Sequence, residues 1–190
     1  MKSLLISIAA FTIMASTQAQ NNTEFSITNQ IINWKGKAAV GGYAPEGTLI
    51  IKNGMLKLEK GEVSALSITI DMTSLSQENK QLSGHLKEED FFHVEKYPEA
   101  LFTMTGSPVP SENGHKISGT MTIKDKTNPE TIVIQLIPQG TDWVVKFRHT
   151  MDRTRYGVVY NSPSIFKRIK ENAIADEFEI WAALKFTERE

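Results

Sequence analysis

The residues with the clearest spacing for metal binding are His85, Glu89 and His93, which lie four positions apart along the chain. On one continuous helix this spacing would place three ligands on the same face. The segment Asp90-Phe91-Phe92 is typical of a helix end, so we expect His93 to lie on a different element. The sequence therefore predicts no metal site, and we expect no cofactor.

A second polar group consists of Asp152, Arg153 and Arg155. A guanidinium donates paired hydrogen bonds to phosphate or carboxylate, so this group has the chemistry to meet the charged head of a ligand. The same residues also suit an ion pair at the surface end of a strand, which would stabilise the fold little. We favour the second interpretation.

Catalytic arrangements are absent from the sequence. No serine lies in a Gly-X-Ser-X-Gly turn, and no glycine-rich phosphate loop is present. The neighbouring Glu88 and Glu89 are typical of a solvated face rather than of an acid–base pair. We therefore expect a protein that is not an enzyme.

Length and charge narrow the class of protein further. The chain has 190 residues, enough for one domain with a substantial core, and a formal net charge of −1 without any block of like charges. Phosphate binding normally requires a basic stripe, so nucleic acid is not expected as a partner. The chain has no cysteine, so its core must hold it together without disulfides.

The first 19 residues have the composition of a secretory signal peptide. Lys2 supplies the positive start, an apolar run covers 4–15, and Thr17-Gln18-Ala19 offers small residues at the cleavage site. This run is too short to span a bilayer comfortably, and no second long apolar run follows. We expect a single mature domain over residues 20–190, exported to the periplasm or secreted.

Apolar residues alternate with polar ones through most of the mature chain, which predicts strands with one buried face. The expected strands lie near 24–34, 48–58, 66–72, 100–104, 117–123, 132–136, 143–147 and 178–186. Turns are expected at Asn53-Gly54, which would divide the second strand, at 111–114 and at 138–140. Helices are expected over 76–87, with Ser76 as N-cap, and over 162–172. The pattern predicts a mainly β protein, either an antiparallel sandwich or a closed barrel.

Five segments, in order along the chain, carry a resemblance to a known family. The longest is His85 to Phe102, HLKEEDFFHVEKYPEALF, and the others are Trp34-Lys35-Gly36, 70–75, 119–129 and 152–178. Together they resemble the YceI-like family of lipid- or polyisoprenoid-binding proteins over residues 22 to 188 or so. The resemblance implies an extended, lipocalin-like antiparallel barrel of about eight strands with an elongated apolar cavity. Relatives often carry a histidine in the early loop, but Tyr43–Gly47 contains none. Any role of that histidine therefore cannot be assigned to this chain.

On this basis we expect a binding protein that holds an isoprenoid, a quinone or a fatty-acyl chain. The alternation gives a set of side chains on one face that we expect to line the cavity: Leu66, Ile68, Ile70, Phe91, Phe92, Phe102, Met104, Phe147 and Ile180. Each of these also suits an ordinary core, in which they contact only one another. The alternative function is a non-catalytic interaction module with a filled barrel, and an enzyme acting on a lipid or quinone precursor is a third. Exposed aromatic residues such as Trp181 are compatible with a homodimer.

Overall fold

The computed structural model describes residues 22–167 and 172–189, so the expected signal peptide lies outside the described residues. The strands are β1 (Asn22–Ile27), β2 (Ile31–Lys35), β3 (Glu46–Glu59), β4 (Glu62–Gln77), β5 (Glu99–Met104), β6 (Val109–Ser111), β7 (Gly114–Ile123), β8 (Lys126–Gln139), β9 (Asp142–Asp152) and β10 (Glu177–Glu188). One α-helix, α1 (Lys80–Lys87), and one 3-10 helix, η1 (Arg153–Tyr156), complete the described elements. None of the described helices has the length and apolar character needed to cross a membrane.

The strands close into an antiparallel barrel, because β10 pairs with β2 on one side and with β9 on the other. Around the barrel the order is β10, β2, β3, β4, β5, β7, β8 and β9, which makes eight strands. β1 takes the same place as β2 nearer the other end of the barrel, since it also lies between β10 and β3. The predicted barrel of about eight strands is confirmed.

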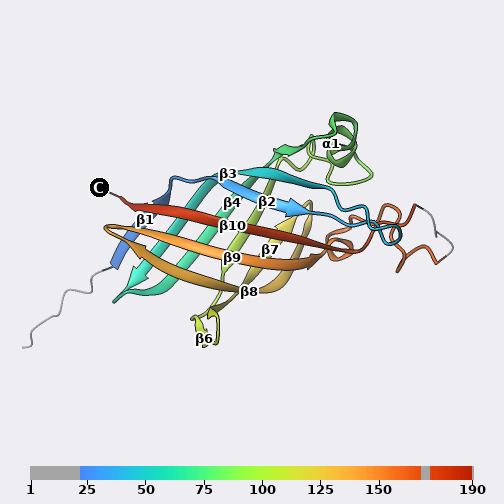
Figure 1. Cartoon of the computed structure of the whole chain (residues 1–190). Coiled ribbons are helices and arrows are strands. Elements are labelled where there is room, and N and C mark those ends of the chain that lie inside the picture. The colour runs from blue at the N-terminus through green and yellow to red at the C-terminus, as the bar shows by residue number, and fades with distance from the viewer. Residues whose placement is uncertain (1–21, 168–171, 190) are drawn as a thin grey trace, which may run out of the picture.

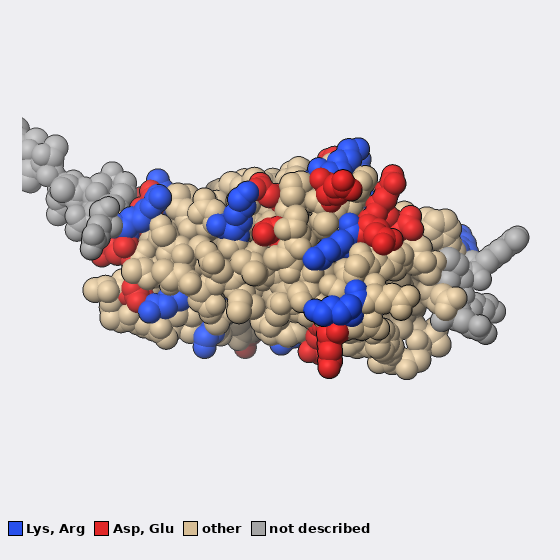
Figure 2. Space-filling model, turned by 90° about the horizontal axis from the view of Figure 1, so that it is seen from above, with Lys and Arg blue, Asp and Glu red and all other residues tan. Residues whose placement is uncertain are grey.

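The barrel is elongated, with α1 near one end and β1 and the C-terminus at the other (Figure 1). On the face seen in Figure 2, basic and acidic side chains are interspersed and do not form a stripe of one sign. The short strand β6 extends from the side of the barrel and pairs only with the start of β7. The predicted turns at 111–114 and 138–140 join β6 to β7 and β8 to β9.

The turn predicted at Asn53-Gly54 is wrong. β3 passes straight through both residues, and its pairing with β4 shifts register between Ile51 and Asn53, as at a β-bulge. A two-residue hairpin needs a positive φ angle, which Gly54 does not have. Instead, Gly54 is buried, and a Cβ atom there would lie 3.2 Å from Cδ1 of Ile68. The glycine therefore serves close packing and not chain reversal.

The helix boundaries also differ from the prediction. β4 continues through Ser76 to Gln77, and α1 begins later, with Asn79 as its N-cap. The Asn79 side chain accepts hydrogen bonds from the backbone N–H groups of Gln81 at 3.0 Å and Leu82 at 3.1 Å. In the described parts of 162–172 the chain forms turns and no helix. The structure has instead the 3-10 helix η1, which the sequence did not predict.

Candidate functional site

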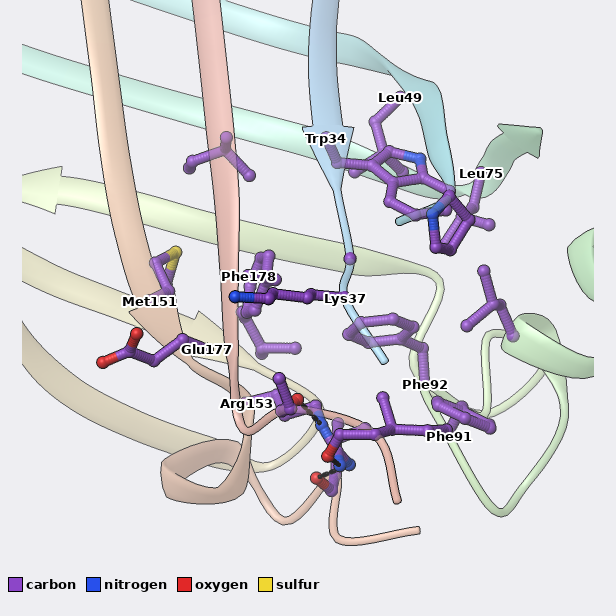
Figure 3. A pocket seen from close by; sticks show the side chains of 18 of the residues that line it. Trp34, Lys37, Leu49, Leu75, Phe91, Phe92, Met151, Arg153, Glu177 and Phe178 are labelled. Carbon is purple, nitrogen blue, oxygen red and sulfur yellow. Dashed lines mark hydrogen bonds between the residues drawn. The ribbon is translucent and has the colours of Figure 1, made fainter. Parts of the chain in front are cut away.

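The half of the barrel nearest α1 is hollow. It contains a cavity of about 180 Å³, and the surface that the wall presents to this space is almost wholly apolar. Every barrel strand except β8 contributes to the wall, and Leu82 and Leu86 of α1 border it as well. Tyr43, which is 59% exposed, also lines the cavity, so the space reaches the surface beside this loop. Figure 3 shows several of the lining side chains around this space.

Trp34 forms part of the wall where β2 meets β3. Its indole lies close to Gly47, where a Cβ atom would come within 2.7 Å of the ring and 2.0 Å of the backbone oxygen of Ser76. Only glycine permits this approach, so Gly47 sets the position of the indole. The indole N–H is buried and has no hydrogen-bond partner among the described residues. An unpaired buried donor costs stability until an acceptor is supplied.

The segment after α1 brings Phe91 and Phe92 to the cavity. Phe91 is fixed by its neighbours, because its ring lies 5.0 Å from the rings of both His85 and Tyr160. Lys124 Nζ donates a hydrogen bond of 3.0 Å to the carbonyl oxygen of Phe91. Phe92 is only partly buried and packs against the core. The motif that carried the family resemblance thus forms the cover of the cavity beside the helix.

Arg153 lies at the edge of the cavity but is buried, with 5% of its surface exposed. Its guanidinium donates hydrogen bonds to three backbone carbonyl oxygens, those of Val158 at 2.8 Å, Ile174 at 2.9 Å and Ala175 at 3.0 Å. Burial lowers the pKa of Arg153, while the nearby carboxylates of Asp176 and Asp152 act in the opposite direction. Arg153 therefore ties together the two chain segments that form this rim.

The other members of the predicted polar group also have structural partners. Asp152 caps η1 by accepting a hydrogen bond of 2.8 Å from the backbone N–H of Thr154. Arg155 donates a hydrogen bond of 2.7 Å to the carboxylate of Glu130. The surface ion pair expected for this group is wrong, because Arg153 is buried and Arg155 pairs with the buried carboxylate of Glu130. Sequence alone could not place Arg153 inside, since two of its three partners are carbonyl groups more than 20 residues further along the chain.

Glu130 is the centre of a polar cluster on the inner face of β8. Its side chain is 7% exposed and accepts a hydrogen bond of 2.8 Å from the hydroxyl of Tyr156, while His149 Nε2 lies 3.0 Å away. Burial raises the pKa of Tyr156, and the hydrogen bond to Glu130 raises it further. The paired part of β8 and β9 ends at Ile134 and Phe147, and beyond that point this cluster joins β8, β9 and η1.

A second, smaller cavity of about 40 Å³ lies deeper in the barrel. Its wall consists only of apolar side chains and includes Leu66, Phe102 and Leu184. The ring of Phe102 leans over Gly119, where a Cβ atom would lie 2.5 Å from it. Below this space the barrel is filled by side chains, among them Phe25, Leu56 and Phe186, which line neither cavity. The lumen therefore changes from hollow to filled along the barrel.

Residues 15–186 match the family described as the YceI-like domain. The chain belongs to this YceI-like family. Among curated relatives, Protein YceI of Escherichia coli O17:K52:H18 is 34% identical over 77 residues, and the match covers 40% of each chain. The chain thus matches well under two thirds of the length of that relative.

Two solved structures share the fold of this YceI-like chain. Burkholderia cenocepacia BcnA superposes with a TM-score of 0.66 at 18% identity, covering 82% of this chain and 95% of that one. A polyisoprenoid binding domain from Saccharophagus degradans, implicated in plant cell wall breakdown, has a TM-score of 0.64 at 11% identity. That match covers 87% of this chain and 98% of the other. At these identities the likeness establishes the fold alone.

Eight of the nine predicted lining residues border one or both cavities. Ile70, Phe91, Phe92 and Ile180 line the larger one. Leu66, Ile68, Phe102 and Phe147 line the smaller one, together with Ile70 and Ile180. Met104 lines neither cavity and is partly buried against the core. Whether any of them contacts a ligand stays a prediction.

Most of the wall of the larger cavity was not predicted. The missed side chains include Trp34, Leu49, Met72, Leu75, Met121, Met151 and Phe178. Trp34 lies in a family motif, and Met72, Met121 and Phe178 lie in expected strands, but neither feature assigns them to a cavity. Alternation shows which face of a strand is buried but not how far along the barrel a residue lies. The wall could therefore not be separated from the filled core by sequence pattern.

The residues considered for metal binding are divided among different elements. His85 belongs to α1, Glu89 follows the end of that helix, and His93 lies in the turn beyond it with a φ angle of 49°. Within 22–167 and 172–189, no group of three or more His, Asp or Glu side chains is placed to hold a metal ion. The imidazole of His85 instead contacts the rings of Phe91 and Tyr160.

Proposed function

We propose that this protein binds the apolar chain of an isoprenoid, a quinone or a fatty acid in the larger cavity. The observation that carries the proposal is a cavity of about 180 Å³, bordered by α1, whose wall offers a ligand almost no polar group. The polyisoprenoid-binding description of one structural neighbour supports the same class of ligand. In this proposal the protein acts as a carrier, a store or a sequestering protein rather than as an enzyme.

Burial alone supplies the binding energy in such a site. Each methylene group transferred from water to an apolar environment gains about 0.8 kcal/mol, so affinity grows with the buried length of the chain. A polar head group would remain at the surface near Tyr43, where the cavity reaches solvent. The ligand then needs no reactive side chain and no metal, and release requires only that the chain leave the cavity.

The proposed setting is outside the cytoplasm. The N-terminal sequence has the three parts of a signal peptide, and the chain lacks cysteine. We propose that the mature protein meets its ligand in the periplasm or after secretion. Cleavage near Gln20 can be checked by the mass of the protein isolated from its own host.

The proposal is tested by native mass spectrometry of the protein purified from its own cell envelope, followed by extraction and identification of bound molecules. An isoprenoid or acyl lipid at near-stoichiometric occupancy is the expected result. Thermal unfolding with added polyprenols, quinones and fatty acids provides a second measurement, because a ligand that binds only the folded state raises the melting temperature. An unliganded mass together with no thermal shift would overturn the proposal and favour an interaction module.

A further inference from the structure

The two cavities share three wall residues, Ile70, Met121 and Ile180. β4 carries Ile70 and β7 carries Met121, with only β5 between these strands, whereas Ile180 comes from β10 across the barrel. All three side chains are almost fully buried, and Met121 is 3% exposed. They therefore lie between the two cavities, on different sides of the lumen. We call these three side chains the partition, because they separate the outer compartment from the inner one.

We propose that the partition, with Met121 as its movable member, sets the length of the apolar chain that the protein accepts. This inference rests on the proposed function and adds a specificity-determining residue to it. A chain entering beside α1 fills the outer compartment of about 180 Å³ and ends against the partition. The inner compartment of about 40 Å³ stays closed to it in the unmodified protein.

The surroundings of Met121 support its role. Phe102 is its register partner on β5, but the Phe102 ring leans over Gly119, on the inner-compartment side. Phe102 lines only the inner compartment, so it backs the partition without entering the outer one. Methionine is unbranched and flexible, whereas Ile70 and Ile180 are β-branched and stiff. The size of the residue at position 121 is therefore the simplest determinant of the depth of the site.

The test measures the affinity of straight-chain fatty acids from octanoic to eicosanoic acid. For the native protein, affinity is expected to rise about fourfold per methylene and then to level off at the length that reaches the partition. Met121→Ala joins the compartments, so the levelling point should move to chains longer by about two carbons or more. Leu58→Ala is the matched control, because Leu58 is equally buried but lines neither cavity.

Two milder variants, Ile70→Val and Ile180→Val, each remove one methylene from the partition. Both are expected to fold, so they test the inference even if Met121→Ala does not fold. They should move the levelling point in the same direction by a smaller amount. A native levelling point that stays unchanged in every folded partition variant would overturn the inference and leave the proposed function intact. A native protein that binds no chain of any length would overturn the proposed function itself.

Discussion

The two ends of this barrel are built from the same strands but have different interiors. β10 shows the contrast best, because its inward face runs from Phe178 at the cavity to Phe186 in the filled end. Around Phe186, Phe25 and Leu56 are almost inaccessible and complete a solid core. Around Phe178, side chains leave a space that no residue fills.

The difference lies in what covers each end. At the filled end β1 extends the sheet, and its Phe25 pairs with Leu56 of β3. At the hollow end the cover comes from α1, the segment with Phe91 and Phe92, and the loops held by Arg153. α1 has no fully buried residue, so it closes the end without filling it. A barrel of this size thus has a solid core at one end and an apolar space at the other.

The largest difference in stability is expected between substitutions of two phenylalanines of β10, Phe186 and Phe178. Phe186→Ala removes a fully buried ring and should lower the free energy of unfolding by about 3–5 kcal/mol. Phe178 borders an existing space, so Phe178→Ala should lower the free energy of unfolding by only about 1–2 kcal/mol. The same substitution should weaken binding of the apolar chain about tenfold. Urea unfolding and fatty-acid titration of both variants check this contrast. Equal stability losses would show that the two ends are packed alike.

The next effect concerns the buried cation at the hollow end. Arg153→Met leaves three backbone carbonyl groups without their donor and should lower the free energy of unfolding by about 3 kcal/mol. Chain affinity should fall as well, since the rim of the cavity loosens. The control is Arg148→Met, which removes an exposed ion pair with Glu179 and should cost less than about 1 kcal/mol. Similar losses in both variants would contradict the anchoring role.

A third comparison enlarges one alanine that lines the larger cavity and one that lines neither cavity. Ala100 lines the larger cavity, whereas Ala182 is equally small and buried but lines neither cavity. Ala182→Leu should overpack the barrel and lower the free energy of unfolding by about 1–3 kcal/mol. Ala100→Leu should be tolerated in the unliganded protein but should abolish the ligand-induced rise in melting temperature. Retention of that rise would indicate that the ligand lies elsewhere.

The smallest expected effect concerns the helix that covers the cavity. Asn79→Ala removes the side chain that caps α1 and should lower the stability of the helix by about 1 kcal/mol. Because Leu82 and Leu86 border the cavity, hydrogen exchange of the helix should quicken more than that of the barrel strands. Asn79→Ser retains a capping oxygen and should restore most of the protection.

Much of the fold follows from sequence pattern. The alternation in β4, β7 and β10 locates strands because a sheet with one buried face requires period two. The failures arise where tertiary contacts override local preference. Gly54 has a turn signature but packs beside Ile68, and Ser76 is a good N-cap residue that the continuing pairing of β4 with β3 keeps in a strand.

The candidate site was less accessible from sequence than the fold. Phe91 and Phe92 could be proposed because a family motif contains them. Met121 and Trp34 could not be assigned to the cavity, because their importance depends on which side chains meet across the lumen. The tilt and register of the strands around the closed barrel determine which side chains face one another inside it. No local sequence pattern encodes that tilt and register.

The position of β10 also determines when the barrel can close during synthesis of the chain. β10 closes the barrel between β9 and the pair β1 and β2, and Arg189 donates a hydrogen bond to Glu24 at a separation of 165 residues. Until β10 has been synthesised, the sheet has free edges on both sides and the barrel cannot close. Contacts of such long range make folding slow. The barrel can therefore close only after β10 has emerged from the ribosome.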